Sequence, residues 1–201
     1  MALVNASYEF MMVDIGCNGC VSDGGVFKNT QFSKQLEEKK LNIPKPTILI
    51  GSNEPLPYVF VCDDAFALSE NIMKPYPQAN LTLEKEIFNY RLSRARQTVE
   101  CAFGIMTARF QVLLGRINLD PNKATLIATT CCYLHNFLTK KNDRAYLHVR
   151  ENDAIQIRLD GLQPTFNRNN SAKIVRNNFC SYFNNAGRVP WQEDRVREGR
   201  S

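Results

Sequence analysis

The segment YVFVCDDAFALSENIMKPYPQ (58–78) runs from five consecutive apolar residues straight into two adjacent carboxylates, Asp63 and Asp64. Five apolar residues in a row are typical of a strand covered on both faces, as in the interior of an α/β sheet. Two acidic side chains at the end of such a strand need solvent, a hydrogen-bonding role in the next turn, or a cation. The segment therefore predicts an α/β fold with polar chemistry at one strand end.

Two interpretations of this acidic pair stay open on the residues alone. In the first, Asp63 or Asp64 caps the turn formed by ALSEN (67–71), as short polar side chains do at turns and helix starts. In the second, a carboxylate of the pair holds Mg²⁺ or Mn²⁺, because these ions prefer hard oxygen ligands.

The elements upstream of this segment are short and end at clear stop signals. They are a strand at 8–16, a glycine-rich loop at 17–25, a short helix at 26–41 with Asn29 or Thr30 as its cap, and a TILI strand (47–50) in a proline-rich connection. Strands and helices thus alternate along this part of the chain, as in an α/β domain.

A long amphipathic helix is predicted to open at Thr82, with Glu84 and Glu86 in its first turn. Its apolar positions recur at spacings of mostly three and four, which buries one face. They are Ile87, Phe88, Leu92, Ala95, Val99, Phe103, Met106 and Phe110. A second helix is predicted from about Lys123 to Leu138, and its apolar positions are Ala124, Ile127, Ala128, Cys131, Leu134 and Phe137.

The composition sets the protein class. The chain has 201 residues and a formal net charge of +5, which is compatible with a nucleic-acid partner. It has no run near the roughly 18 apolar residues of a membrane span, and its N-terminus lacks the pattern of a secretory signal. Seven cysteines, an odd number, indicate reduced thiols inside the cell. We expect a domain over residues 1–140 and a polar extension over 141–201, with one helix at 171–184 and about ten mobile residues at the end.

Glu100 lies on the flank of the long helix, with Arg96 one turn and Ser93 two turns before it and Gly104 one turn after it. One interpretation is a surface ion pair between Arg96 and Glu100, which contributes about a few tenths of a kcal/mol to stability. The other places a carboxylate beside a phosphate-binding arginine. A strand-end aspartate and a helix glutamate could then hold two divalent ions that activate water and stabilise the leaving oxygen of a phosphodiester.

An ordered set of motifs carries a resemblance to a known family. The motifs are DIGCNGCVSDGGVF (14–27), YVFVCDDAFAL (58–68), KPYPQANLTLEKEIFNYRLSRARQTVECAFGIMTARFQVL (74–113), CCYLHNFL (131–138) and VPWQ (189–192). Taken in this order they resemble the DDE nuclease domain of the PIF/Harbinger transposases and their domesticated relatives. The resemblance implies an RNase H-like fold, which is a mixed sheet flanked by helices that carries an Asp-Asp-Glu triad and two metal ions.

The resemblance also implies roles for individual residues. The second family aspartate falls on Asp63 and the glutamate on Glu100, so these two are the implied catalytic residues. Asp23 matches a further metal-ligand position, and Asp23, Asp63 and Glu100 are the implied ligands of Mg²⁺ or Mn²⁺. Arg96 matches a phosphate-binding position, and Asp64 is left as an exposed neighbour.

The implied function is hydrolysis of DNA phosphodiester bonds by a two-metal mechanism. The implied partners are DNA and a Myb-like DNA-binding protein, with neither a membrane nor a small-molecule substrate. The implied location is the nucleus, with the cytoplasm as a second location.

The sequence also departs from the family pattern. The family's first catalytic aspartate ends an early strand, and by order along the fold it falls upstream of Met1, while Asp14 matches an ordinary loop position. We therefore expect an N-terminally truncated nuclease core with weak or absent cleavage. Two alternatives stay open: a catalytically dead domain that binds DNA or a partner protein, and a transposon remnant that folds poorly because an unpaired strand edge is exposed.

Several other residues have a simpler interpretation. Cys17 and Cys20 form C-x-x-C, but a zinc site needs a second pair at suitable spacing. His135 in LHNF is predicted to be a buried, hydrogen-bonded core histidine. Trp191 is predicted to anchor the C-terminal segment. The basic residues of the tail are expected to be a solvated end that could add phosphate contacts; they are Arg195, Arg197 and Arg200.

Overall fold

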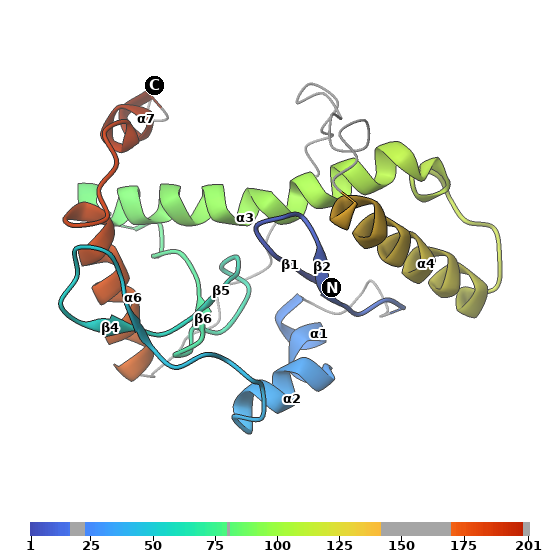
Figure 1. Cartoon of the computed structure of the whole chain (residues 1–201), viewed down its shortest axis with the longest axis horizontal. Coiled ribbons are helices and arrows are strands. Elements are labelled where there is room, and N and C mark those ends of the chain that lie inside the picture. Colours follow the sequence, from blue (N-terminus) through green and yellow to red (C-terminus); the bar gives the residue numbers. More distant parts are fainter. Residues whose placement is uncertain (17–22, 80, 142–169, 199–201) are drawn as a thin grey trace. The chain divides into compact units, whose positions relative to one another are not determined.

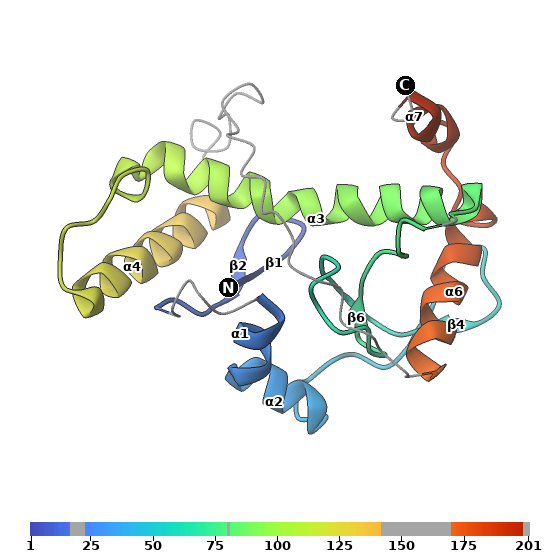
Figure 2. The same ribbon diagram turned by 180° about the vertical axis from the view of Figure 1, so that it is seen from behind.

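The computed structural model describes residues 1–16, 23–79, 81–141 and 170–198 (Figure 1, Figure 2). Its elements in chain order are β1 (Ala2–Val4), β2 (Phe10–Val13), α1 (Asp23–Asn29), α2 (Gln31–Glu37), β3 (Thr47–Ile48), β4 (Pro55–Leu56), β5 (Phe60–Val61), β6 (Ile72–Met73), α3 (Leu83–Arg109), a 3₁₀ helix (Gln111–Leu113), α4 (Pro121–Lys140), α6 (Asn170–Asn184) and α7 (Gln192–Glu198). The predicted mixed α/β class is confirmed. Within the described residues the strands pair two by two, so the RNase H-like assignment depends on the family and is taken up below.

The described chain divides into two compact units, and each has its own core. The first unit comprises residues up to Val26 together with those from Gln97 to Lys141, and the second comprises residues 27–96 together with α6 and α7. Helix α3 contributes its first half to the second unit and its second half to the first. The predicted extension beyond residue 140 contains both α6 and α7, and the boundary at 140 stays a prediction. Within the described residues, no helix combines the length and apolar character that a membrane crossing requires.

The first unit is built on the antiparallel pair β1 and β2. Asn5 shapes the turn between them, because its side-chain oxygen accepts hydrogen bonds from the backbone N–H groups of Ser7 and Glu9. Phe10 then enters a core formed with Ala102 and Met106 of α3 and with Cys131 and Cys132 of α4. The strand predicted at 8–16 is confirmed as β2, although it is shorter than predicted.

The second unit is built on the parallel pair β5 and β6, in which Phe60 pairs with Ile72 and Val61 with Met73. Its core combines Met73 with Phe88 and Leu92 of α3, and with Ala172 and Cys180 of α6. The helix predicted at 171–184 is confirmed as α6. Because α6 supplies two buried residues of this core, it is an integral part of the unit and not an appendage.

The single helix predicted at 26–41 is wrong: the structure has α1 and α2, separated at Thr30. The Thr30 hydroxyl donates to the carbonyl of Phe27 at 2.7 Å and accepts from the N–H of Ser33 at 3.0 Å. One side chain therefore ends the first helix and caps the second. Thr30 was one of the two caps that the sequence suggested, but a helix start was placed before it.

The long helix is confirmed as α3, yet its buried face differs from the predicted stripe. Ile87, Phe88 and Leu92 are buried as predicted, whereas Ala95 is exposed and Ala102 is fully buried. The reason is that the two halves of α3 serve two cores and bury different faces. A single continuous stripe was therefore the wrong description of this helix.

The second predicted helix is confirmed as α4, and here too the buried face is displaced. Leu134 and Phe137 were predicted to be buried but are 45% and 55% exposed. Cys132, His135 and Thr139 lie in the interior instead. Hydrogen bonds from His135 and its neighbour, described below, fix this rotation of the helix.

Residues 192–198, which lie within the end predicted to be mobile, form helix α7. Gln192 fixes its start and is 1% exposed. Its side-chain oxygen accepts from Arg91 Nη1 at 3.1 Å and from the N–H of Val189 at 3.3 Å, while its nitrogen donates to the carbonyl of Phe183 at 3.0 Å. The predicted anchor Trp191 contacts the ring of Tyr90, but it is Gln192 that is buried.

Gln192→Ala is expected to lower the free energy of unfolding by about 1–3 kcal/mol, because it removes a buried side chain and leaves partly buried polar groups of Arg91 and Phe183 without this partner. Urea unfolding followed by circular dichroism measures the change. Gln97→Ala, at an exposed position of α3, is the matched control and should cost less than about 0.5 kcal/mol. Equal losses in the two variants would contradict the role given to Gln192.

Candidate functional site

Asp63 and Asp64 follow β5 after one intervening residue, Cys62, at the carboxyl end of the parallel pair. The pairing continues one step beyond the strand, since the N–H of Cys62 donates to the carbonyl of Met73 at 2.9 Å. Lys74 follows β6 at the same edge. Carboxyl ends of neighbouring parallel strands are the usual place for ligand sites in α/β proteins. The strand end predicted from YVFVCDD is therefore confirmed, and a lysine lies beside it.

The carboxylate of Asp63 has a local structural role. Its Oδ1 accepts a hydrogen bond from the N–H of Ala65 at 3.0 Å, so Asp63 caps the turn that follows β5. The turn that Asp63 caps therefore lies just before the ALSEN segment (67–71) for which a cap was predicted. This hydrogen bond leaves the metal interpretation open, because a carboxylate has two oxygens and about four acceptor sites. Asp64 is exposed, as predicted for a neighbour outside the site.

Lys74 is the residue of this edge that sequence reasoning missed. Its side chain is almost fully buried, and its Nζ donates to the backbone carbonyl of Asp64 at 2.9 Å. Burial lowers the pKa of Lys74, and Arg176 lowers it further, while the nearby carboxylates of Asp64 and Asp63 act in the opposite direction. Burial and the charge of Asp63 raise the pKa of Cys62 to about 12, so this thiol stays protonated and is no nucleophile at neutral pH.

The neighbouring KPYP segment is held rigidly. The side-chain amide of Asn89 binds the backbone of Tyr76 on both sides, accepting from its N–H at 2.7 Å and donating to its carbonyl at 2.9 Å. The Tyr76 hydroxyl donates to Asn177 at 2.7 Å, and the Arg176 guanidinium lies 4.1 Å from the ring centroid. These contacts with α3 and α6 fix the backbone two residues after Lys74, and hence the edge that carries it.

Arg96 and Glu100 lie four residues apart on α3, and therefore on one face of the helix, as predicted. Both side chains are half-buried. Arg96 belongs to the second unit and Glu100 to the first, whereas Asp63 lies wholly within the second. Arg96 and Glu100 thus lie one turn apart on the same helix. The described surroundings of Asp63 belong to the second unit alone.

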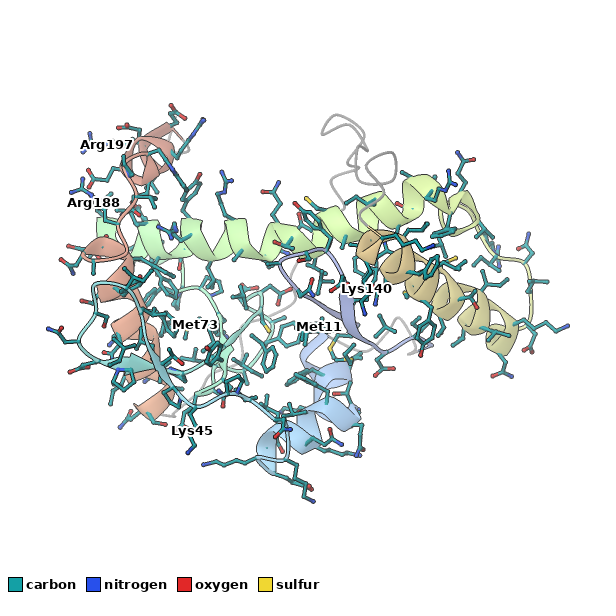
Figure 3. The ribbon with its side chains drawn as sticks, in the orientation of Figure 1. Met11, Lys45, Met73, Lys140, Arg188 and Arg197 are labelled. Atoms are coloured by element: carbon teal, nitrogen blue, oxygen red, sulfur yellow. The ribbon has the colours of Figure 1, made fainter. Side chains whose placement is uncertain are left out.

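Four of the residues considered in the sequence lie wholly or partly outside the described residues. Asp23 is the first residue of α1, but its side chain is not among those described. Cys17 and Cys20 also fall outside, as does Arg200. The tail arginines that are described form ion pairs: Arg195 with Glu198 at 3.0 Å and Arg197 with Glu193 at 3.9 Å. Figure 3 shows Arg197 on the outside of α7, as expected for a solvated end.

The donor chemistry of Asp63 and Glu100 fits Mg²⁺ or Mn²⁺, since both supply hard carboxylate oxygens. Over the described ranges, however, no three His, Cys, Asp or Glu side chains lie close enough together to hold a metal ion. Asp23, the third predicted ligand, has a side chain outside those described.

Residues 1–136 match the DDE superfamily endonuclease family. The chain belongs to this family. The match runs from β1 into α4 and includes all of the predicted site residues, while α6 and α7 lie beyond it. The predicted resemblance to DDE nucleases is thereby confirmed.

One curated relative of this DDE endonuclease chain is "Protein ALP1-like" from Arabidopsis thaliana, which is 29% identical over 145 residues. The aligned part covers 71% of this chain and 35% of the relative. The chain therefore spans about a third of the length of that protein. No solved structure matches the chain.

The LHN motif of this DDE endonuclease chain has a structural explanation. His135 is fully buried, and its Nε2 donates to the carbonyl of Tyr8 at 2.7 Å, which confirms the predicted core histidine. Asn136 accepts from the N–H of Phe10 and donates to its carbonyl, each at 2.8 Å. The two side chains attach the β1–β2 pair to α4. The motif thus has a structural role, because it helps to hold the first unit together.

Proposed function

We propose that this chain carries a metal-dependent DNA endonuclease site of transposase origin, on an RNase H-like core. Asp63 and Glu100 are the catalytic carboxylates and, with Asp23, the metal ligands, while Arg96 contacts phosphate. The observation that supports this best is the location of Asp63, at the carboxyl end of a parallel strand pair inside the segment that matches the DDE endonucleases. Glu100 follows on the half-buried flank of α3, inside the same match.

Each of these residues has a task that its surroundings support. The N–H of Ala65 orients the Asp63 carboxylate, so one oxygen is fixed and the direction of the other is set. Arg96 presents a guanidinium one helical turn from Glu100, which suits a phosphate oxygen next to the reacting bond. When bound, divalent ions supply activation of a water and stabilisation of the leaving oxygen. Helix α3 holds Arg96 and Glu100 at a fixed spacing. A phosphate bound by Arg96 therefore has a fixed position relative to the metal ligand Glu100.

The partner that this site requires is DNA, and the net charge of +5 favours a polyanion. We further propose a Myb-like DNA-binding protein as an accessory partner, and action in the nucleus with the cytoplasm as a second location. The substrate is a polymer, and neither a membrane nor a small molecule takes part.

A second function is favoured by one sequence observation: the first catalytic aspartate of the family has no match among residues 1–201. On this alternative the domain binds DNA or a partner protein without cutting. Binding would then depend on arginine and lysine contacts with phosphate, and its affinity would fall steeply with salt.

Plasmid nicking tests the nuclease proposal. The unmodified chain is expected to nick weakly or not at all with Mg²⁺ or Mn²⁺ present. Any nicking that it does show is expected to fall by at least about a hundredfold in Asp63→Asn and in Glu100→Gln, because each removes a charged ligand. Glu70→Gln changes an exposed carboxylate of the same unit and should leave the rate within about threefold of the unmodified chain. Agarose gels measure the rate of conversion from supercoiled to open-circular DNA.

The outcomes separate the two functions. Nicking that survives in both Asp63→Asn and Glu100→Gln would sink the nuclease proposal as stated. A chain that does not nick but binds labelled duplex DNA, with an affinity that falls as salt rises, would support the binding function. Fluorescence anisotropy over a salt series provides that second measurement, and circular dichroism confirms that each variant is folded.

A further inference from the structure

The carboxyl edge of β5 and β6 holds a positive charge as well as negative ones. Asp63 and Asp64 follow β5, and Lys74 follows Met73, the last residue of β6, which Figure 3 labels within the second unit. Because β5 and β6 are parallel and in register, their following residues meet at one edge. The lysine is thus part of the same strand-end site as the proposed metal ligand.

Lys74 is held in place and cannot swing away easily. Its side chain is 8% exposed, and its Nζ donates to the carbonyl of Asp64 at 2.9 Å. An ammonium in such a place is tolerated only with hydrogen-bond and charge partners. The carbonyl of Asp64 is the first, and the carboxylates of Asp64 and Asp63 are near enough to favour the charged form.

The ammonium of Lys74 meets part of the need of this edge for positive charge. A turn that carries two adjacent carboxylates attracts positive charge, and a fixed ammonium provides some of it without any ion from solution. Two cations near one carboxylate repel each other strongly when water is largely excluded. A divalent ion that approaches Asp63 therefore meets a positive charge already in place.

We propose that Lys74 is a built-in cation of this site, which supplies positive charge at the Asp63–Asp64 turn and thereby weakens the binding of a divalent ion to Asp63. The inference rests on the proposed role of Asp63 as a metal ligand and deepens it. It means that the free protein loads metal poorly, and that an anionic phosphate at the same edge favours loading by offsetting the charge of Lys74.

A purely structural role for Lys74 gives a different expectation, and one variant separates the two. Lys74→Gln keeps a donor that can reach the Asp64 carbonyl but removes the charge. Lys74→Arg keeps the charge. If Lys74 acts as a cation, the glutamine variant binds metal more tightly and the arginine variant does not. If Lys74 only fixes the turn through its hydrogen bond to the Asp64 carbonyl, neither variant changes the metal affinity.

The test is titration of the full chain with Mn²⁺, without DNA, with the free ion measured by electron paramagnetic resonance. Lys74→Gln is expected to lower the Mn²⁺ dissociation constant by about tenfold or more. Adding Asp63→Asn to Lys74→Gln should abolish the gain. Lys45→Gln, at an exposed lysine of the same unit that Figure 3 also labels, is the matched control and should leave the constant unchanged.

Each outcome decides something. If Asp63→Asn weakens Mn²⁺ binding but Lys74→Gln leaves it unchanged, the inference about Lys74 is overturned and the proposed metal role of Asp63 survives. If Asp63→Asn leaves Mn²⁺ affinity unchanged both with lysine and with glutamine at position 74, Asp63 is not a metal ligand. The inference about Lys74 then fails as well. If Lys74→Gln does not fold, Lys74→Met is the second variant. Asp63-dependent binding by the unmodified chain in about the micromolar range would overturn the inference without any variant at 74.

Discussion

Phe88→Ala is expected to lower the free energy of unfolding by about 3–5 kcal/mol, the usual loss for a buried phenylalanine. Phe88 is completely buried at the centre of the second unit. Its ring lies 5.1 Å from that of Tyr76 in an edge-to-face arrangement and 5.9 Å from that of Phe183. Removal of the ring leaves a cavity between α3, the KPYP segment and α6, three segments that cannot all move inward to fill it.

Urea unfolding of Phe88→Ala, monitored by circular dichroism, measures this loss. Phe137→Ala is the matched control, because Phe137 lies on α4 with 55% of its side chain exposed. It should cost less than about 1 kcal/mol. If the two variants lose the same stability, the core assigned to the second unit is wrong.

His135→Ala is expected to cost about 2–4 kcal/mol in the first unit. The imidazole is fully buried, lies 5.0 Å from the ring of Phe10 in an edge-to-face contact, and donates to the carbonyl of Tyr8. Alanine removes the packing and leaves that carbonyl without this donor. Tyr133→Ala, two residues earlier on the same helix and 73% exposed, is the control and should cost far less.

The pH dependence of this loss has a definite sign. Burial lowers the pKa of His135 from its ordinary value of 6.5. Below about 6.5 the unfolded chain therefore binds a proton at this residue that the folded chain does not, so stability falls as pH drops towards the lowered value. The advantage of the unmodified chain over His135→Ala should be largest above pH 6.5 and shrink as pH falls below it. Urea titrations at several pH values measure that difference, and an advantage that grew on acidification would contradict a buried neutral imidazole.

The long helices were the most predictable part of the fold. Periodic apolar residues and acidic first turns located α3, and periodicity alone located α4 and α6, because these patterns follow from helix geometry itself. What sequence could not give was which face each helix buries. Ala95 fits a continuous stripe but is exposed, since α3 serves one core before it and another after it. The same applies to Leu134, because the rotation of α4 is set by hydrogen bonds of His135 and Asn136 to a strand far away in sequence.

The candidate site was predictable in part for a similar reason. Asp63 was found because an apolar run marks β5, whereas Lys74 was missed because β6 is only two residues long and no apolar run marks it. Without that strand, nothing in the sequence places residue 74 beside residue 63. Burial and pairing therefore supplied the information that periodicity lacks.

The two asparagine side chains that bind backbone from both sides carry a further consequence. At Phe10 and at Tyr76, the amides of Asn136 and Asn89 each need one nitrogen that donates and one oxygen that accepts. Deamidation, the spontaneous ageing reaction of asparagine, exchanges that nitrogen for an oxygen and adds a negative charge. The backbone carbonyl would then face a carboxylate, so attraction would become repulsion. At each of these two sites, one amide nitrogen thus decides whether the side chain attracts or repels the backbone carbonyl.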